Sequence, residues 1–233
     1  MKLTRDYKEK FLKTYEDFKN KISVIEKLND KEYSLFFPMI GENFESKKTL
    51  LVVGRACNGW EHPWKSINSD NSIVNLSISC SEGKPMQWLI EQWTDTKYKI
   101  KRSSFWRIIK NITLFLNECN EKDWPSFIAW SNLFKISPYE KGNPNMSECD
   151  VQLQNCIELF EQEIEELKPE YVLLIVGLDW GKTFLESIAS KIEYFNNEIV
   201  KCVANYKDSK LILTVRPEGK KQELFINSIK TYL

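Results

Sequence analysis

Short apolar runs along this chain alternate with stretches in which apolar residues recur every three or four positions. The apolar runs lie at residues 48–54, 126–136, 171–177 and 210–215. Each has the length and the continuous apolar character of a strand whose two faces are both buried. The segment 198–206 alternates less regularly, and it predicts an edge strand of the same sheet.

Helical spacing of apolar residues predicts helices around these strands. The apolar residues within 11–25, 103–118 and 153–167 each line one face of a helix, and a further helix follows the last strand. Phe105 and Phe115 belong to the apolar face of the second of these helices. Helices between strands provide the crossover connections that parallel neighbours require.

Several polar residues predict where the helices begin, end and meet solvent. Ser147 and Asp150 form a capping box for the third helix, which Pro169 ends. Asp179 can cap the helix after the third strand. The carboxylates within the sequence EQEIEELK, at residues 161–168, fall on the outer helix face, and we expect them to be solvated.

Together these elements predict an α/β fold. We expect a three-layer αβα arrangement with a central, mainly parallel four-stranded sheet. We assign residues 1–233 to a single domain, with 1–47 as an N-terminal helical extension packed on it. The polar segment 66–85 is either a lid or a mobile loop.

The loops that follow the predicted strands should lie together, because the carboxyl ends of parallel strands share one edge of the sheet. Ligands bind at that edge in folds of this class. The sequences of these loops are GRACNGWEHPW, NLFKISPYEKGNP, VGLDWGK and VRPEGKK.

Composition excludes several classes of protein. The 33 basic and 33 acidic residues cancel, so any polyanion must be met by a local patch rather than by the overall charge. The six cysteines form no C-x-x-C pair, and His62 is the single histidine, so we expect free thiols, no metal site and no cofactor. Neither a signal peptide nor a membrane span is apparent, and we expect a cytoplasmic monomer.

Polar and aromatic residues in the strand-end loops are candidates for ligand binding. Gly54 and Arg55 follow the first strand in a glycine-bearing loop that is either a site of close backbone approach or an ordinary turn. Asn132 can offer a donor and an acceptor to the edge of a base, or it satisfies a neighbouring backbone group. Trp60 and Trp64 could stack a base.

The last loop carries a cluster of cations. Arg216, Lys220 and Lys221 stand at a strand-to-helix junction, where cations and free backbone N–H groups can hold a phosphate. The alternative is a solvated helix start. No signal in the sequence pairs His62 with a nucleophile such as serine or cysteine, so the sequence does not support a catalytic triad.

The order of these segments resembles the uracil-DNA glycosylase superfamily over roughly residues 48–232. LLVVG is similar to the first motif of that family, and WSNLFKISP to its strand motif with a base-reading asparagine. EIEELKPEYVLLIVG is similar to its next helix–strand unit, and LTVRPEG stands where the family has H-P-S. The resemblance implies the fold described above and cleavage of the bond between a flipped base and its sugar.

The resemblance assigns roles to individual residues. It implies that Asn132 reads the base and that Trp60 or Trp64 stacks it. Arg55 and Ala56 stand where the family places its catalytic Asp, Asn or Glu, so Asn58 or Glu61 would have to position the water.

Two further positions differ from the pattern of that family. Arg216 replaces the family histidine and could stabilise negative charge on the base. Ile136 replaces the motif cysteine, so we expect no iron–sulfur cluster.

Three hypotheses follow from the sequence. The first is a divergent DNA glycosylase that acts on a uracil-like or damaged base flipped from single- or double-stranded DNA. The second is a catalytically inactive nucleic-acid or nucleotide-binding protein of the same fold. The third is an α/β enzyme that binds an unrelated small anion between Arg55 and Arg216.

Overall fold

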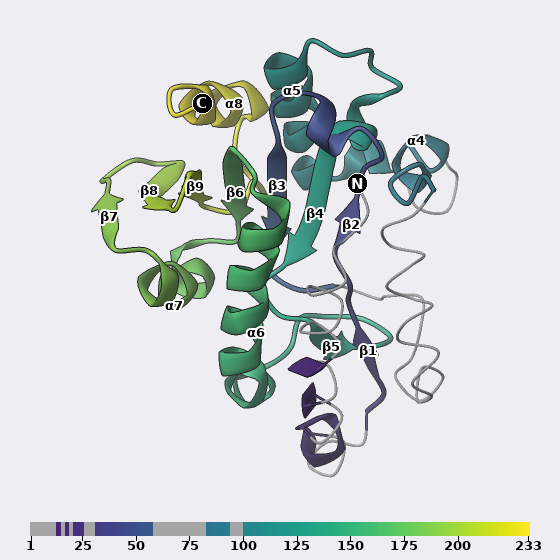
Figure 1. Ribbon diagram of the computed structural model, residues 1–233, viewed down its shortest axis with the longest axis vertical. Coiled ribbons are helices and arrows are strands. Elements are labelled where there is room, and N and C mark those ends of the chain that lie inside the picture. The colour runs from purple at the N-terminus through teal and green to yellow at the C-terminus, as the bar shows by residue number, and fades with distance from the viewer. Residues whose placement is uncertain (1–12, 15–16, 19–20, 26–30, 58–82, 94–99) are drawn as a thin grey trace.

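The computed structural model describes residues 13–14, 17–18, 21–25, 31–57, 83–93 and 100–233 (Figure 1). Its main sheet has seven strands of mixed orientation, in the order β2-β4-β3-β6-β9-β8-β7. Their bounds in that order are Met39–Ile40, Ile128–Asn132, Leu50–Gly54, Tyr171–Ile175, Ser209–Thr214, Val200–Tyr206 and Lys191–Tyr194. The prediction of a four-stranded sheet is therefore wrong in strand number, although the α/β class is confirmed.

Four adjacent strands of this sheet are parallel. Strand β3 pairs in parallel with β4 on one side and with β6 on the other, and β6 pairs in parallel with β9. Strands β2, β8 and β7 join this group through antiparallel pairing. The segment predicted as an edge strand forms β8. Strand β7 pairs with the outer side of β8, so β7 is the edge strand on this side of the sheet. The sequence of β7, KIEY, is too polar and short to predict a strand.

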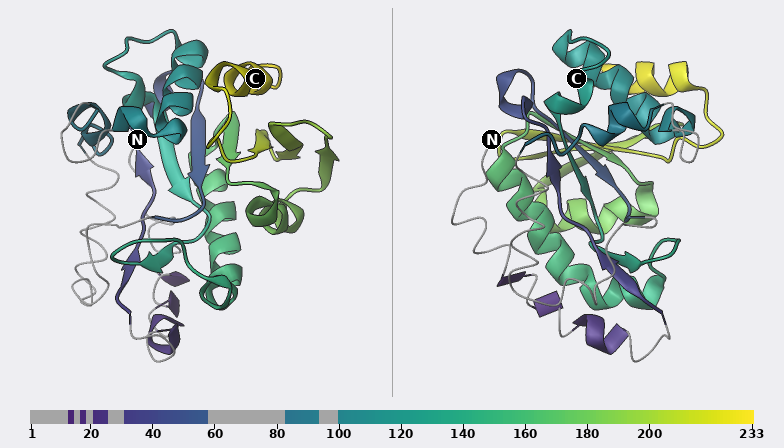
Figure 2. Two further views of the ribbon diagram at one scale, coloured as in Figure 1. Left: turned by 180° about the vertical axis from the view of Figure 1, so that it is seen from behind. Right: turned by 90° about the vertical axis from the view of Figure 1, so that its right-hand side faces the viewer.

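Helices lie on both faces of the sheet, as the side view in Figure 2 shows. Helices α5 and α8 pack on one face, and α6 and α7 pack on the other. Within β3, Leu50 and Val52 point to the first face while Leu51 and Val53 point to the second, which is why the whole strand is apolar. The helix bounds are Trp88–Glu91 for α4, Ser104–Asn117 for α5, Met146–Leu167 for α6, Leu178–Ile188 for α7 and Gln222–Lys230 for α8.

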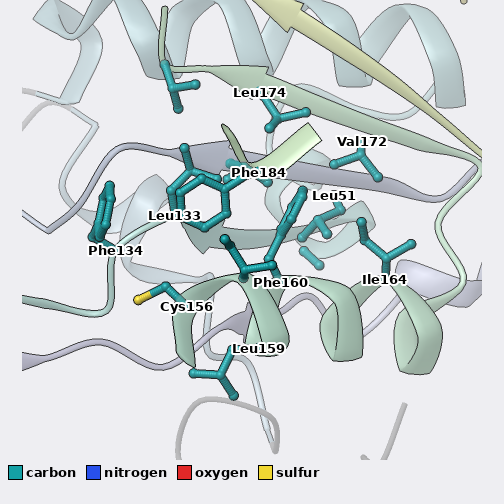
Figure 3. Close-up of a cluster of buried hydrophobic side chains, with 14 of the residues drawn as sticks. Leu51, Leu133, Phe134, Cys156, Leu159, Phe160, Ile164, Val172, Leu174 and Phe184 are labelled. Atoms are coloured by element: carbon teal, nitrogen blue, oxygen red, sulfur yellow. The ribbon is translucent and has the colours of Figure 1, made fainter. Parts of the chain in front are cut away.

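The core on the α6 side is built from helix and strand residues that meet across the layer. Figure 3 shows Phe160 and Ile164 of α6 together with Leu51 and Val172 of the sheet and Phe184 of α7. All are essentially inaccessible to solvent. On the opposite face Phe115 is 49% exposed, so its predicted place in the apolar stripe of α5 is wrong.

The N-terminal segment contributes to both sheets as well as to a helix. Residues 21–25 are helical, and Phe18 is buried in the α6-side core, as the spacing predicts. Strand β1 (Tyr33–Leu35) pairs antiparallel with β5 (Ile136–Pro138) in a second, two-stranded sheet. Strands β1 and β2 both lie within residues 1–47. The segment predicted as a helical extension therefore also contains strands.

Short 3-10 helices connect several of these elements. They are η1 (Phe44–Ser46), η2 (Ile100–Arg102) and η3 (Trp124–Phe127). Segment η2 leads directly into α5, and η3 leads into β4.

The helix caps differ from the predicted ones. The capping box of α6 is Asn145 with Glu148, because the Asn145 side chain accepts from the Glu148 N–H while the Glu148 carboxylate accepts from the Asn145 N–H. Asp179 lies within the first turn of α7, whose N-cap is Gly177 with a φ of 85°. Helix α6 ends at Leu167, just before Pro169, as predicted.

Candidate functional site

The carboxyl ends of β3, β4, β6 and β9 meet at one edge of the sheet, as the pairing of these parallel strands requires. Gly54 and Asn132 are direct neighbours in the register of β3 and β4. Beyond the strands, the Leu133 N–H donates to the Gly54 carbonyl and the Phe134 N–H to the Arg55 carbonyl, each at 2.9 Å. The predicted strand-end residues are therefore held close together by backbone hydrogen bonds.

The side chain of Asn132 is fixed in a small space beside Gly54. It is 2% exposed, and its amide nitrogen donates to the Cys57 thiol at 3.3 Å. The amide oxygen lies too close to the place that a Cβ on Gly54 would take, so any larger residue there would displace the Asn132 side chain. The ring of Phe105, from the first turn of α5, reaches within 3.8 Å of the same place.

A buried ion pair lies on the other side of β4 from the Asn132 amide. The Lys135 ammonium donates to Glu163 at 2.6 Å, to the Ser131 hydroxyl at 2.7 Å and to the Asn132 carbonyl at 2.7 Å. The Ser131 hydroxyl donates to the second Glu163 oxygen at 2.7 Å. Lys135 and Glu163 are both inaccessible to solvent, so the prediction that the carboxylates of 161–168 are solvated is wrong for Glu163.

This network fixes the backbone at the end of β4. A buried ammonium needs several acceptors to offset the loss of its hydration, and here the Asn132 carbonyl is one of them. The network therefore holds the same residue whose amide faces Gly54.

Arg55 is held back against α7. Its Nε donates to the Val176 carbonyl at 2.6 Å, and its guanidinium lies 4.9 Å from the centre of the Trp180 ring. Partial burial, followed by the nearby positive charge of Arg216, lowers the pKa of Arg55. Arg55 and Arg216 are thus close enough to repel one another.

The remaining predicted cations lie in the loop after β9 and at the start of α8. Arg216 makes a two-point ion pair with Glu218 of the same loop. Lys220 pairs with Glu198 at 2.8 Å, and Lys221 is the N-cap residue of α8. Arg216 and Lys220 therefore each have a carboxylate partner within the chain.

Four candidate residues lie outside the described part of the chain. They are Asn58, Glu61, Trp60 and Trp64, so their expected roles remain predictions. The segment 66–85, the expected lid or loop, lies outside it up to residue 82.

Several tryptophans gather between the sheet and α5. Trp106 and Trp130 are buried, with ring centroids 5.0 Å apart. Trp88 contacts both rings, and Trp93 and Trp124 extend the cluster. Phe105 packs edge-on against Trp106 with centroids 4.9 Å apart, which fixes the ring that faces Gly54.

Phe105, Cys57, Lys135 and Glu163 are the site residues that sequence analysis missed. Phe105 appeared only as one member of an apolar helix face. A lysine between Phe134 and Ile136 was the available signal for a buried charge.

Comparison with known proteins assigns no family to this chain. No protein-family model matches it, and no curated protein matches it significantly. In the described segments, no group of three or more histidine, cysteine, aspartate or glutamate residues is arranged to hold a metal ion. Among the described helices, none has both the length and the apolar character needed to cross a membrane.

Proposed function

We propose that this protein is a divergent DNA glycosylase-like protein of the uracil-DNA glycosylase superfamily. In this proposal the carboxyl edge of the sheet receives an altered base flipped from DNA, and the bond between that base and its sugar is hydrolysed. The observation that carries the proposal is the buried Asn132 amide, set opposite Gly54 at the ends of adjacent parallel strands.

The partner of the Asn132 amide nitrogen supports base recognition. A thiol is a weak hydrogen-bond acceptor, whereas a base carbonyl is a strong one. If the Asn132 amide donated to a base carbonyl in place of the Cys57 thiol, its hydrogen bond would therefore be stronger. The Phe105 ring, which borders the same space, is suited to contact the face or edge of a planar heterocycle.

The proposed reaction requires a water and a cation. The water oxygen bonds to the sugar carbon while the carbon–nitrogen bond breaks and the base leaves as an anion. The base then takes the proton that the water releases. Arg216 is 45% exposed and can turn from Glu218 to the departing base, where its guanidinium offers two donors. We assign positioning of the water to Asn58 or Glu61.

A noncatalytic role in binding nucleic acid or nucleotides is the second candidate function. The observation that favours it is the pair Arg55 and Ala56 directly after Gly54, where the family resemblance requires an acid or amide. The guanidinium of Arg55 is occupied by Val176 and Trp180, so it does not replace that group. A small-anion site between Arg55 and Arg216 is less favoured, because the Val176 carbonyl and the Trp180 ring already engage the Arg55 guanidinium.

The test is release of free base from oligonucleotides that each carry one deaminated or alkylated base, in single- and double-stranded form. We expect release by the natural protein and its loss in Asn132→Ala and Asn132→Asp. Asn205→Ala, an exposed amide in β8, is the matched control and should retain activity. Salt-dependent DNA binding without release selects the noncatalytic function. Absence of both release and DNA binding overturns the proposal.

A further inference from the structure

A basic surface lies beside the candidate site, where η2, α5 and α8 begin. It consists of Lys101 and Arg102 of η2, Arg107 of α5, and Arg216, Lys220 and Lys221 from the loop and cap before α8. The whole chain has a formal net charge of zero, so this grouping is a local feature.

Arg107 joins the two helix starts that form this surface. Its guanidinium donates to the Lys101 carbonyl and to the Gln222 side chain, each at 2.9 Å, and to the Ser104 hydroxyl at 3.2 Å. These hydrogen bonds bring the residues before α5 next to the first residue of α8. All three acceptors are neutral, so the positive charge of Arg107 is not cancelled.

Four cations of the basic surface have no ion pair with a carboxylate in the described part of the chain. Glu218 and Glu198 pair with Arg216 and Lys220. Lys101, Arg102, Arg107 and Lys221 have no such partner among the described residues. The positive ends of α5 and α8 add to the potential of these four side chains.

The basic surface and the space in front of Asn132 share the first turn of α5. Phe105, in the first turn of α5, reaches toward Gly54, and Arg107 follows it two residues later. A strand that places a base at Asn132 would therefore bring its flanking phosphates to the starts of α5 and α8.

We propose that the basic surface binds the phosphodiester backbone of a DNA strand, with Lys101, Arg102, Arg107 and Lys221 as the contacting cations. The proposal rests on the proposed function, because it names the surface that holds the DNA whose base Asn132 receives. It adds Lys101, Arg102 and Arg107 to the residues that the sequence indicated.

The expected salt dependence follows from the number of contacts. Each phosphate neutralised on single-stranded DNA contributes about −0.7 to the slope of log K against log salt concentration. Four contacts give a slope of about −2.8, which is a loss of affinity of about 50-fold between about 50 and 200 mM salt.

The experiment is a titration of an unmodified single-stranded oligonucleotide, followed by fluorescence anisotropy over this salt range. The test variant is Lys101→Gln/Arg102→Gln, which should reduce the magnitude of the slope by about 1.4. Lys221→Gln should reduce it by about 0.7. The matched control is Lys122→Gln/Lys168→Gln, which removes the same charge from two exposed residues near the ends of α5 and α6. Its slope should equal that of the natural protein.

Failure of this inference is distinguishable from failure of the proposed function. Equal salt-dependence slopes for the test and control variants, or no DNA binding by the natural protein, overturn the proposal that the basic surface binds DNA. Base release with an unchanged slope leaves the glycosylase function standing without this surface. A reduced slope in the test variants without base release supports the surface and removes the hydrolytic step.

Discussion

Replacement of Glu163 by glutamine should destabilise the protein far more than an ordinary charge substitution. Glu163→Gln keeps the shape of the side chain but leaves the Lys135 ammonium buried without a carboxylate. The ammonium is inaccessible to solvent, so water cannot replace the lost charge. Removal of one partner of such a pair costs about 3–5 kcal/mol of the free energy of unfolding.

The same reasoning predicts a smaller loss when both charges are removed. In Lys135→Met/Glu163→Leu no charge remains buried, and replacement of a buried pair by apolar residues is often neutral or stabilising. The double variant should therefore be more stable than Glu163→Gln. The coupling between the two positions should be about 0.5–3 kcal/mol, because the side chains are in direct contact.

Urea unfolding followed by tryptophan fluorescence measures these free energies. Glu186→Gln is the control, because Glu186 pairs with Lys182 on the exposed face of α7 and should contribute about 0.3–0.5 kcal/mol. If Glu163→Gln lowered the free energy of unfolding by less than about 1 kcal/mol, the reasoning would be refuted, because so small a loss is typical of a pair in contact with solvent. Strict additivity of the two substitutions would refute it as well.

Two further predictions concern Asn132 and a buried thiol. Gly54→Ala should cost about 1–3 kcal/mol of the free energy of unfolding, because its Cβ would overlap the Asn132 oxygen. Addition of Asn132→Ala should recover much of that loss in the same urea assay, and no recovery would contradict the overlap. Burial raises the pKa of the Cys156 thiol from 9.0 to about 12. The folded state then holds this proton more tightly than the unfolded state. Stability should therefore fall between about pH 9 and pH 12, by about 1.4 kcal/mol per pH unit from this thiol. Cys156→Ala should show a shallower fall, and equal slopes would contradict the assignment.

Local patterns were sufficient to predict the central strands and the longer helices. Strands β3, β6 and β9 are continuous apolar runs because both of their faces are covered. Strands β1 and β7 have only three and four residues, and long-range pairing rather than composition stabilises them. The sequence N-x-x-E at Asn145 suits a capping box as well as Ser147 and Asp150 do, so the sequence alone does not decide which of them caps α6.

The candidate site was partly predictable because strand order places Asn132 beside Gly54. The Lys135–Glu163 pair was not, because its members are 28 residues apart and α6 must dock before they meet. Helical periodicity identified the inner face of α6 but could not show that Glu163 faces Lys135. Phe105 was assigned to an apolar face because periodicity does not distinguish a ring in the core from one that borders a site.

The most direct test of the central claim is an experiment that locates the altered base on the protein. An oligonucleotide that carries one 5-iodouracil can be crosslinked by light, and the modified peptides can be identified by mass spectrometry. We predict adducts in peptides that contain Phe105, Cys57 or Asn132, at the carboxyl edge of the sheet. Adducts confined to peptides of β7 and β8, or none above the level of an oligonucleotide with the same sequence and no iodine, would contradict the account.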